Sequence, residues 1–198
     1  TSELGGLARW DKGGKLYAPA NKFSQLCEPL SPIVFNDLFC LARSEVHTLS
    51  VGAARPTDFD EHLKVLPLLE EAEKHLAPIL ARLDQTLAEV LGRDWTDNWK
   101  KGLPRWEEVP GQIQVREILR LRNLVKAFGM VEYGHMRYNM LGNGDHWFPG
   151  FKADRLDGVL DKFTKAVSAS PFAAQIPEAL REAHALMAGE EKKRLGSH

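Results

Sequence analysis

The residues of this chain whose types and spacing point most clearly to chemistry lie between positions 46 and 63. A turn of small residues, Gly52 to Ala54, is followed by the basic residue Arg55 and by Pro56, which opens an amphipathic helix. Turn amides and a cation at the start of a helix are groups with which many proteins bind phosphate. We therefore expect Gly52, Ala54 and Arg55 to hold an anionic group.

Acidic residues crowd the first turn of the same helix, and a histidine follows them. Carboxylates at this place favour the helix dipole, but they oppose direct binding of an anion to the helix terminus. They are better suited to accept hydrogen bonds from the sugar or from amino groups of a base. An alternative stays open, in which Arg55 is an ordinary surface residue and the acids only cap the helix. The acidic residues are Asp58, Asp60 and Glu61, and the histidine is His62.

Two predicted elements position this turn. The β-branched run 46–51 predicts a strand, and the helix from Pro56 carries Phe59, Leu63 and Leu66 on one apolar face. A single strand cannot satisfy its own backbone groups, so 46–51 must find a strand partner elsewhere or stop being a strand. Apolar periodicity predicts helices over 21–29, 31–41, 67–91, 113–128, 130–141 and 156–167, and a last one from Pro177.

Smaller features refine these elements. Ser31, before Pro32, is the predicted N-cap of its helix. The polar pair Asn36-Asp37 interrupts the apolar run of that helix, and we expect it to face solvent or a partner. Trp95 and Trp99 lie one helical turn apart and are expected to anchor one packing surface. Residues 94–112 are predicted to form a loop-rich connector at a candidate internal boundary.

Composition excludes several classes of function. The 26 basic and 27 acidic residues give a net charge of -1, which argues against a general nucleic-acid-binding protein. No apolar run is long enough to span a membrane. The two cysteines, Cys27 and Cys40, form no CxxC pair, so we expect a reducing cytoplasm and no four-cysteine zinc or iron–sulfur site. Because Thr1 is not a methionine, we expect the natural start to be missing or processed.

Two further groups of residues have polar side chains that suggest a site. The adjacent pair Asp145-His146 suggests acid–base or metal chemistry, but neighbouring residues rarely converge on one ligand, so we expect no metal site there. The helix 113–128 presents a basic face, which is either solvated or a groove for an acidic partner. That face consists of Arg116, Arg120, Arg122 and Lys126.

Residues 51–62 resemble the last strand, loop and helix of the aldo-keto reductases, which are (β/α)8 barrels that bind NADPH. The family pattern there is close to Pro-Gly-Ala-Ser-Lys-Pro-x-x-Leu-x-Glu-Asn. The resemblance implies that Arg55 and the Ala54 backbone lie near the adenosine 2′-phosphate, with Asp58, Glu61 and His62 toward the adenine. The chain departs from the pattern at Ala54, where the family has serine, and at His62, where it has asparagine.

The resemblance extends along most of the chain. Residues 11–17 look like the loop after the seventh strand of the barrel, and Phe35–Leu41 looks like the seventh helix. Beyond residue 70 the chain resembles the helical extension of one branch, which often ends in an iron–sulfur segment. Ser170 stands where that branch has a cysteine, and the companion cysteines are absent, so no iron–sulfur cluster is implied.

The resemblance implies a mainly α chain: residues 1–70 would be a C-terminal remnant of the barrel, and 71–195 a helical C-terminal domain. The catalytic tyrosine, lysine, aspartate and histidine of the family lie in the first half of the barrel, which would precede Thr1, so no catalytic residue is expected here. We expect the C-terminal part of an NADPH-dependent carbonyl reductase, inactive alone, whose partner is the missing barrel half. The alternative is a non-enzymatic helical module for interaction or self-association.

Overall fold

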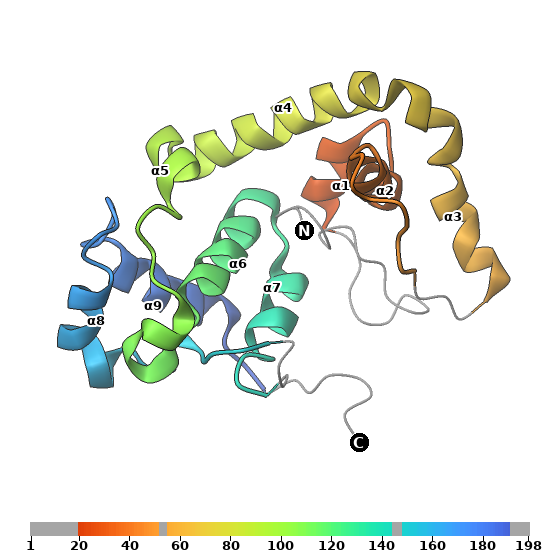
Figure 1. The fold of residues 1–198 in the computed structure, drawn as a ribbon. Helices are drawn as coiled ribbons and strands as arrows, with labels where there is room; N and C mark the ends of the chain where they lie inside the picture. The colour runs from red at the N-terminus through yellow and green to blue at the C-terminus, as the bar shows by residue number, and fades with distance from the viewer. Residues whose placement is uncertain (1–19, 52–54, 144–147, 191–198) are drawn as a thin grey trace. The chain divides into compact units, whose positions relative to one another are not determined.

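The computed structural model describes residues 20–51, 55–143 and 148–190, and in these ranges the chain is mainly helical, as predicted (Figure 1). The chain divides into two compact units, residues 1–86 and 87–198. The longest helix, α4 (Ala72–Leu91), begins in the first unit and ends in the second. No helix in the described ranges combines the length and apolar character that crossing a bilayer requires.

The first unit is built on α1 (Asn21–Cys27) and α2 (Pro32–Leu41). The predicted cap of α2 is confirmed, because the Ser31 hydroxyl accepts a hydrogen bond from the Val34 amide at 3.3 Å. The Phe23 and Phe35 rings meet edge to face at 6.4 Å between centroids. Both rings are fully buried, and they join the two helices in one apolar core.

Short helical segments follow α2 and lead into α4. They are η1 (Pro56–Phe59), α3 (Asp60–Leu63) and η2 (Leu66–Glu71). The helix α4 continues through Pro78, and its Arg82 guanidinium donates to the Leu26 carbonyl at 3.0 and 3.1 Å. This contact ties α4 to the end of α1 and satisfies a carbonyl that the helix terminus leaves without an intrahelical partner.

The predicted strand over 46–51 is wrong, because these residues adopt no regular secondary structure. Across the described residues the only β contact is an isolated parallel bridge between Ile113 and Phe151. A β-branched run favours a strand only when a neighbouring strand supplies partners for its N–H and C=O groups. No such neighbour is present among the described residues, so the run stays irregular.

The second unit is organised around α6 (Val115–Phe128), which packs against α7 (Val131–Tyr138) and α9 (Ile176–Met187). Gly129 ends α6 in the left-handed conformation, at φ 69°, as a glycine at this position does in many helices. The smaller elements of this unit are α5 (Arg93–Asn98), η3 (Trp106–Glu108), η4 (Pro110–Gln112), η6 (Ala153–Arg155), η7 (Asp157–Val159) and α8 (Leu160–Ala166).

Candidate functional site

The structure places four of the six predicted nucleotide-binding residues on one short segment. Arg55 is the N-cap of η1, Asp58 lies in η1, and Glu61 and His62 lie in α3. The other two, Gly52 and Ala54, lie outside the described residues. Asp11–Tyr17 and the pair Asp145-His146 also lie outside them, so their predicted chemistry stays a prediction.

Arg55 and Asp58 form a local pair at the start of η1. The Asp58 carboxylate accepts hydrogen bonds from the Arg55 backbone amide at 3.0 Å and from its guanidinium at 3.1 and 3.3 Å. The Arg55 side chain is 70% exposed, whereas that of Asp58 is 19% exposed. Asp58 therefore caps this turn and orients an arginine that remains accessible to an anion from solution.

Glu61 faces α2 rather than solvent alone. Its carboxylate accepts a hydrogen bond from the Ser31 hydroxyl at 2.5 Å and pairs with Lys64 at 2.5 Å. Partial burial alone would raise the pKa of Glu61, but the hydrogen bonds from Lys64 and Ser31 outweigh it and hold that pKa below its ordinary value. Glu61 is consequently ionised at neutral pH and engaged through both carboxylate oxygens.

His62 also faces α2, where it contacts Asp37, a residue expected from the sequence to face solvent or a partner. Its Nδ1 lies 2.5 Å from the Asp37 carboxylate, and Asp37 is only 4% exposed. The expectation that Asp37 faces solvent or a partner is thus wrong. The signal was available in the helical spacing, because Asp37 lies four residues after Ile33 and three after Val34, two buried positions of α2.

These contacts separate the four residues by role. Arg55 keeps an exposed cationic group, and the other three are engaged with protein partners, Asp58 within its own segment and Glu61 and His62 with α2. A phosphate is the kind of ligand that Arg55 fits. No group of three histidine, cysteine or carboxylate side chains among the described residues is arranged to hold a metal ion.

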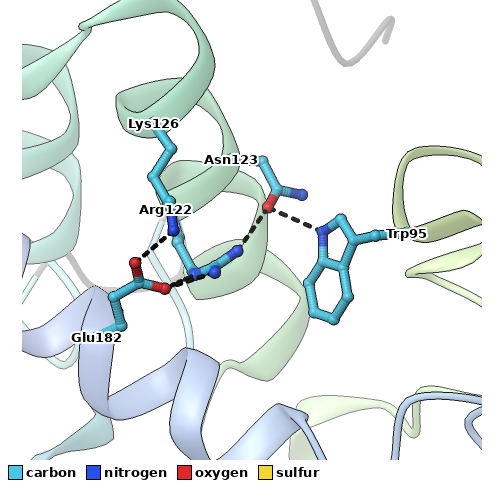
Figure 2. Close-up of polar contacts among 5 residues, drawn as sticks. All are labelled: Trp95, Arg122, Asn123, Lys126 and Glu182. Atoms are coloured by element: carbon cyan, nitrogen blue, oxygen red, sulfur yellow. Dashed lines mark hydrogen bonds and ion pairs between the residues drawn. The ribbon is translucent and has the colours of Figure 1, made fainter. Parts of the chain in front are cut away.

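The basic face predicted for α6 is largely neutralised within the second unit. Glu182 of α9 pairs with both Arg122 and Lys126, as Figure 2 shows, and Arg120 pairs with Glu117 at 2.7 Å. Partial burial favours the neutral form of Glu182, but the hydrogen bonds from Lys126 and Arg122 outweigh it and lower its pKa. The two pairs with Glu182 tie α6 to α9, whereas the Arg120–Glu117 pair lies within α6, so these three cations have partners inside the unit.

The same network reaches the first tryptophan of the predicted pair. The Trp95 indole donates to the Asn123 side-chain oxygen at 3.1 Å, and the Arg122 guanidinium lies 5.4 Å from the Trp95 ring centroid (Figure 2). Trp95 and Trp99 are 8% and 7% exposed, so their prediction as core anchors is confirmed. The indole nitrogen of Trp95 and the side-chain oxygen of Asn123 thus satisfy each other inside the second unit.

Tyr138 has a buried hydroxyl group that could be taken for a general acid. Its contacts indicate a structural role instead. Its hydroxyl accepts a hydrogen bond from the Ala153 amide at 3.0 Å and lies 2.7 Å from His184 Nδ1. Burial raises the pKa of Tyr138 well above its ordinary value. A general acid needs a pKa near the working pH and access to substrate, and fully buried Tyr138 has neither.

An open groove of about 490 Å³ lies in the first unit, between the end of α2 and the start of α4. Its floor is apolar, and Phe39, Ala72 and Leu76 are buried there. The Arg43 guanidinium lies over the Phe39 ring at 3.8 Å, and two carboxylates, Glu70 and Glu73, stand at the edge. None of these groups forms a pair suited to proton transfer or nucleophilic attack.

No protein-family model, no curated protein and no solved structure matches this chain.

Proposed function

We propose that this chain is the C-terminal part of a cytoplasmic, NADPH-dependent oxidoreductase of the aldo-keto reductase kind, and that it contributes the adenosine end of the cofactor site. The observation that supports the proposal best is Arg55. Its side chain is 70% exposed, directly follows the small residues 52–54 in the sequence, and is oriented by Asp58. An accessible, oriented arginine is well suited to bind the 2′-phosphate that distinguishes NADPH from NADH.

The order of elements also supports the proposal. The helix α2, the irregular run 46–51 and the segment η1–α3 follow one another along the chain in the order of helix, strand and helix in the last unit of such a barrel. α2 and α3 pack against each other, as neighbouring outer helices of a (β/α)8 barrel do. On this proposal, the run 46–51 would become a strand when the rest of the barrel supplies its partners.

The predicted cofactor-binding residues differ in how available they are for contacts with NADPH. Arg55 fits a phosphate, but both oxygens of Glu61 already have partners in Ser31 and Lys64. Bound NADPH would supply the hydride for carbonyl reduction, and in the family the proton comes from the first half of the barrel. Because Tyr138 is buried with a raised pKa, we expect no turnover by this chain alone.

The test is the thermal unfolding of the chain with saturating NADPH and with NADH. A ligand that binds the folded state raises the melting temperature. We expect a larger shift with NADPH, and we expect Arg55→Ala to remove the difference. Arg93→Ala is the matched control, because Arg93 is also an exposed arginine paired with a nearby aspartate, at 3.4 Å. Equal shifts with the two dinucleotides, or no shift with either, would overturn the proposal.

A second candidate function, a self-associating helical module, is favoured by one observation. Large apolar side chains are exposed along η1, α3 and η2: Phe59 at 44%, Leu63 at 56% and Leu66 at 57%. A second copy of the chain would cover this ridge in a symmetric contact. Light scattering tests it: a dimer that Leu63→Glu dissociates, and that the control Val131→Glu leaves intact, supports it, whereas a monomer at all concentrations excludes it.

A further inference from the structure

Residues 55–63, which we term the arm, lie on α2 without a fully buried apolar side chain. Neither η1 nor α3 contains a buried residue, and the largest apolar side chains, Phe59 and Leu63, are 44% and 56% exposed. A helix as short as α3 has little stability of its own and normally depends on burying an apolar face. Apolar packing is strong only beyond the end of the arm, at Val65, which is 3% exposed, so interactions of another kind contribute to the contact of the arm with α2.

Polar contacts are the interaction that the structure shows. Three arm residues combine a charged or titratable side chain with partial burial: Asp58, Glu61 and His62. Asp58 pairs with Arg55 inside the arm, whereas the Ser31 hydroxyl reaches Glu61 at 2.5 Å and the Asp37 carboxylate reaches His62 at 2.5 Å. The arm is consequently attached to α2 by two side-chain pairs, one of which includes a histidine.

The charges around His62 are defined by its neighbouring elements. On α2 the titratable groups are Asp37 and Cys40, and burial raises the pKa of the Cys40 thiol, which keeps it neutral. On the arm, Glu61 is ionised and paired with Lys64. The remaining charged groups on η1, α3 and η2 are Arg55, Asp58, Asp60, Glu70 and Glu71.

Among all these groups, only an imidazole ordinarily changes its charge between pH 5 and 8. A protonated His62 faces the buried Asp37 carboxylate as a cation, so the contact combines a hydrogen bond with charge attraction. A neutral His62 keeps the hydrogen bond alone. The attachment is therefore stronger with a protonated imidazole than with a neutral one.

We propose that the Asp37–His62 contact is a pH-dependent latch, which holds the arm more firmly on α2 with a protonated imidazole than with a neutral one. Arg55 belongs to the arm, so release would change where this exposed cation is presented. The proposal does not depend on NADPH binding, because it concerns only the contact between the arm and α2.

Amide hydrogen exchange of the full chain tests the latch. Exchange of the arm amides is measured at about pH 5.5 and pH 8 and is expressed relative to the unfolded chain at the same pH, which removes the intrinsic effect of pH. We expect arm protection to fall about tenfold at the higher pH, the scale of one charge-assisted hydrogen bond. The amides of α2 serve as the internal reference for global unfolding.

Three variants make the result specific. His62→Gln keeps a hydrogen-bond donor but cannot change charge, and Asp37→Asn keeps an acceptor without charge, so both should abolish the pH dependence of arm protection. His75→Gln on α4 is the matched control and should retain it. The proposal is overturned if wild-type arm protection is equal at the two pH values, or if the change persists in His62→Gln. It is equally overturned if the α2 amides lose protection in parallel with the arm.

Discussion

The Tyr138 hydroxyl lies 2.7 Å from His184 Nδ1 and accepts a hydrogen bond from the Ala153 amide at 3.0 Å. The contact with His184 is a second hydrogen bond of the same hydroxyl, and the tautomer of the imidazole sets which of the two groups donates in it. One buried hydroxyl thereby links the end of α7, the middle of α9 and the start of η6.

Replacing that hydroxyl should destabilise the second unit. Tyr138→Phe leaves the buried Ala153 amide without its partner, and we expect the free energy of unfolding to fall by about 1–3 kcal/mol. Urea unfolding followed by circular dichroism measures the change. Val131→Ala, at a position that is 52% exposed, should change stability much less. Equal stability of Tyr138→Phe and the parent chain would show that the hydroxyl contacts contribute nothing.

A second prediction concerns the close approach of helices at Gly134. A Cβ atom there would lie 2.5 Å from Val125 Cγ2 and 2.9 Å from Met187 Sδ, so the residue allows α6, α7 and α9 to meet. We expect Gly134→Ala to lower the free energy of unfolding by about 1–3 kcal/mol through overpacking. The control is Gly158→Ala, because nothing lies within 4 Å of a Cβ at that position. A Gly134→Ala chain as stable as the control would contradict this packing.

A third prediction follows from the lowered pKa of Glu182. A carboxyl group whose pKa is lower in the folded than in the unfolded chain contributes stability above its unfolded-state pKa, which is about 4.3. That contribution is lost as the pH falls through the folded-state pKa. Because the side chain is 35% exposed, we expect it to amount to about 1 kcal/mol after screening.

Urea midpoints measured between about pH 3 and pH 6 test this contribution. The parent chain should lose stability towards low pH, and Glu182→Gln should flatten that loss. Glu178→Gln is the control, because its carboxylate is 81% exposed and makes only a 3.7 Å contact with Arg181. If the two variants give the same pH dependence, Glu182 does not hold α9 to α6 by its charge.

A fourth prediction concerns the thiols. Burial raises the pKa of Cys27 to about 12, and Cys27 is fully buried in the core of the first unit. The thiolate is the reactive form, so Cys27 should react with a disulfide reagent at neutral pH only after unfolding. Cys40 is partly exposed and should react first. Two thiols that react at one rate in the folded chain would contradict the burial of Cys27.

The helical elements could be predicted because their signals are local. Ser31 before Pro32 predicts a helix start from side-chain capping, and Gly129 predicts a helix end from its freedom at positive φ. The burial of both Trp95 and Trp99 also follows from spacing within about one helical turn. Such signals act over a few residues and do not require knowledge of the tertiary contacts.

The predictions that failed depend on contacts distant in the sequence. The run 46–51 has the composition of a strand, but a strand also needs a partner that no local signal supplies. Asp37 is polar and was expected to be exposed, yet His62, 25 residues later, makes its burial tolerable. The exposed apolar ridge at Phe59 and Leu63 similarly depends on which side of α3 meets α2.

The most direct test of the proposed cofactor site is the affinity of the chain for adenosine 2′,5′-bisphosphate, measured by titration calorimetry against adenosine 5′-phosphate. These nucleotides differ only by the 2′-phosphate that Arg55 is proposed to bind. We predict that the bisphosphate binds about tenfold more tightly, and that Arg55→Ala removes this preference while Arg93→Ala keeps it. Equal affinities for the two nucleotides, or an unchanged preference in Arg55→Ala, would contradict the proposed function.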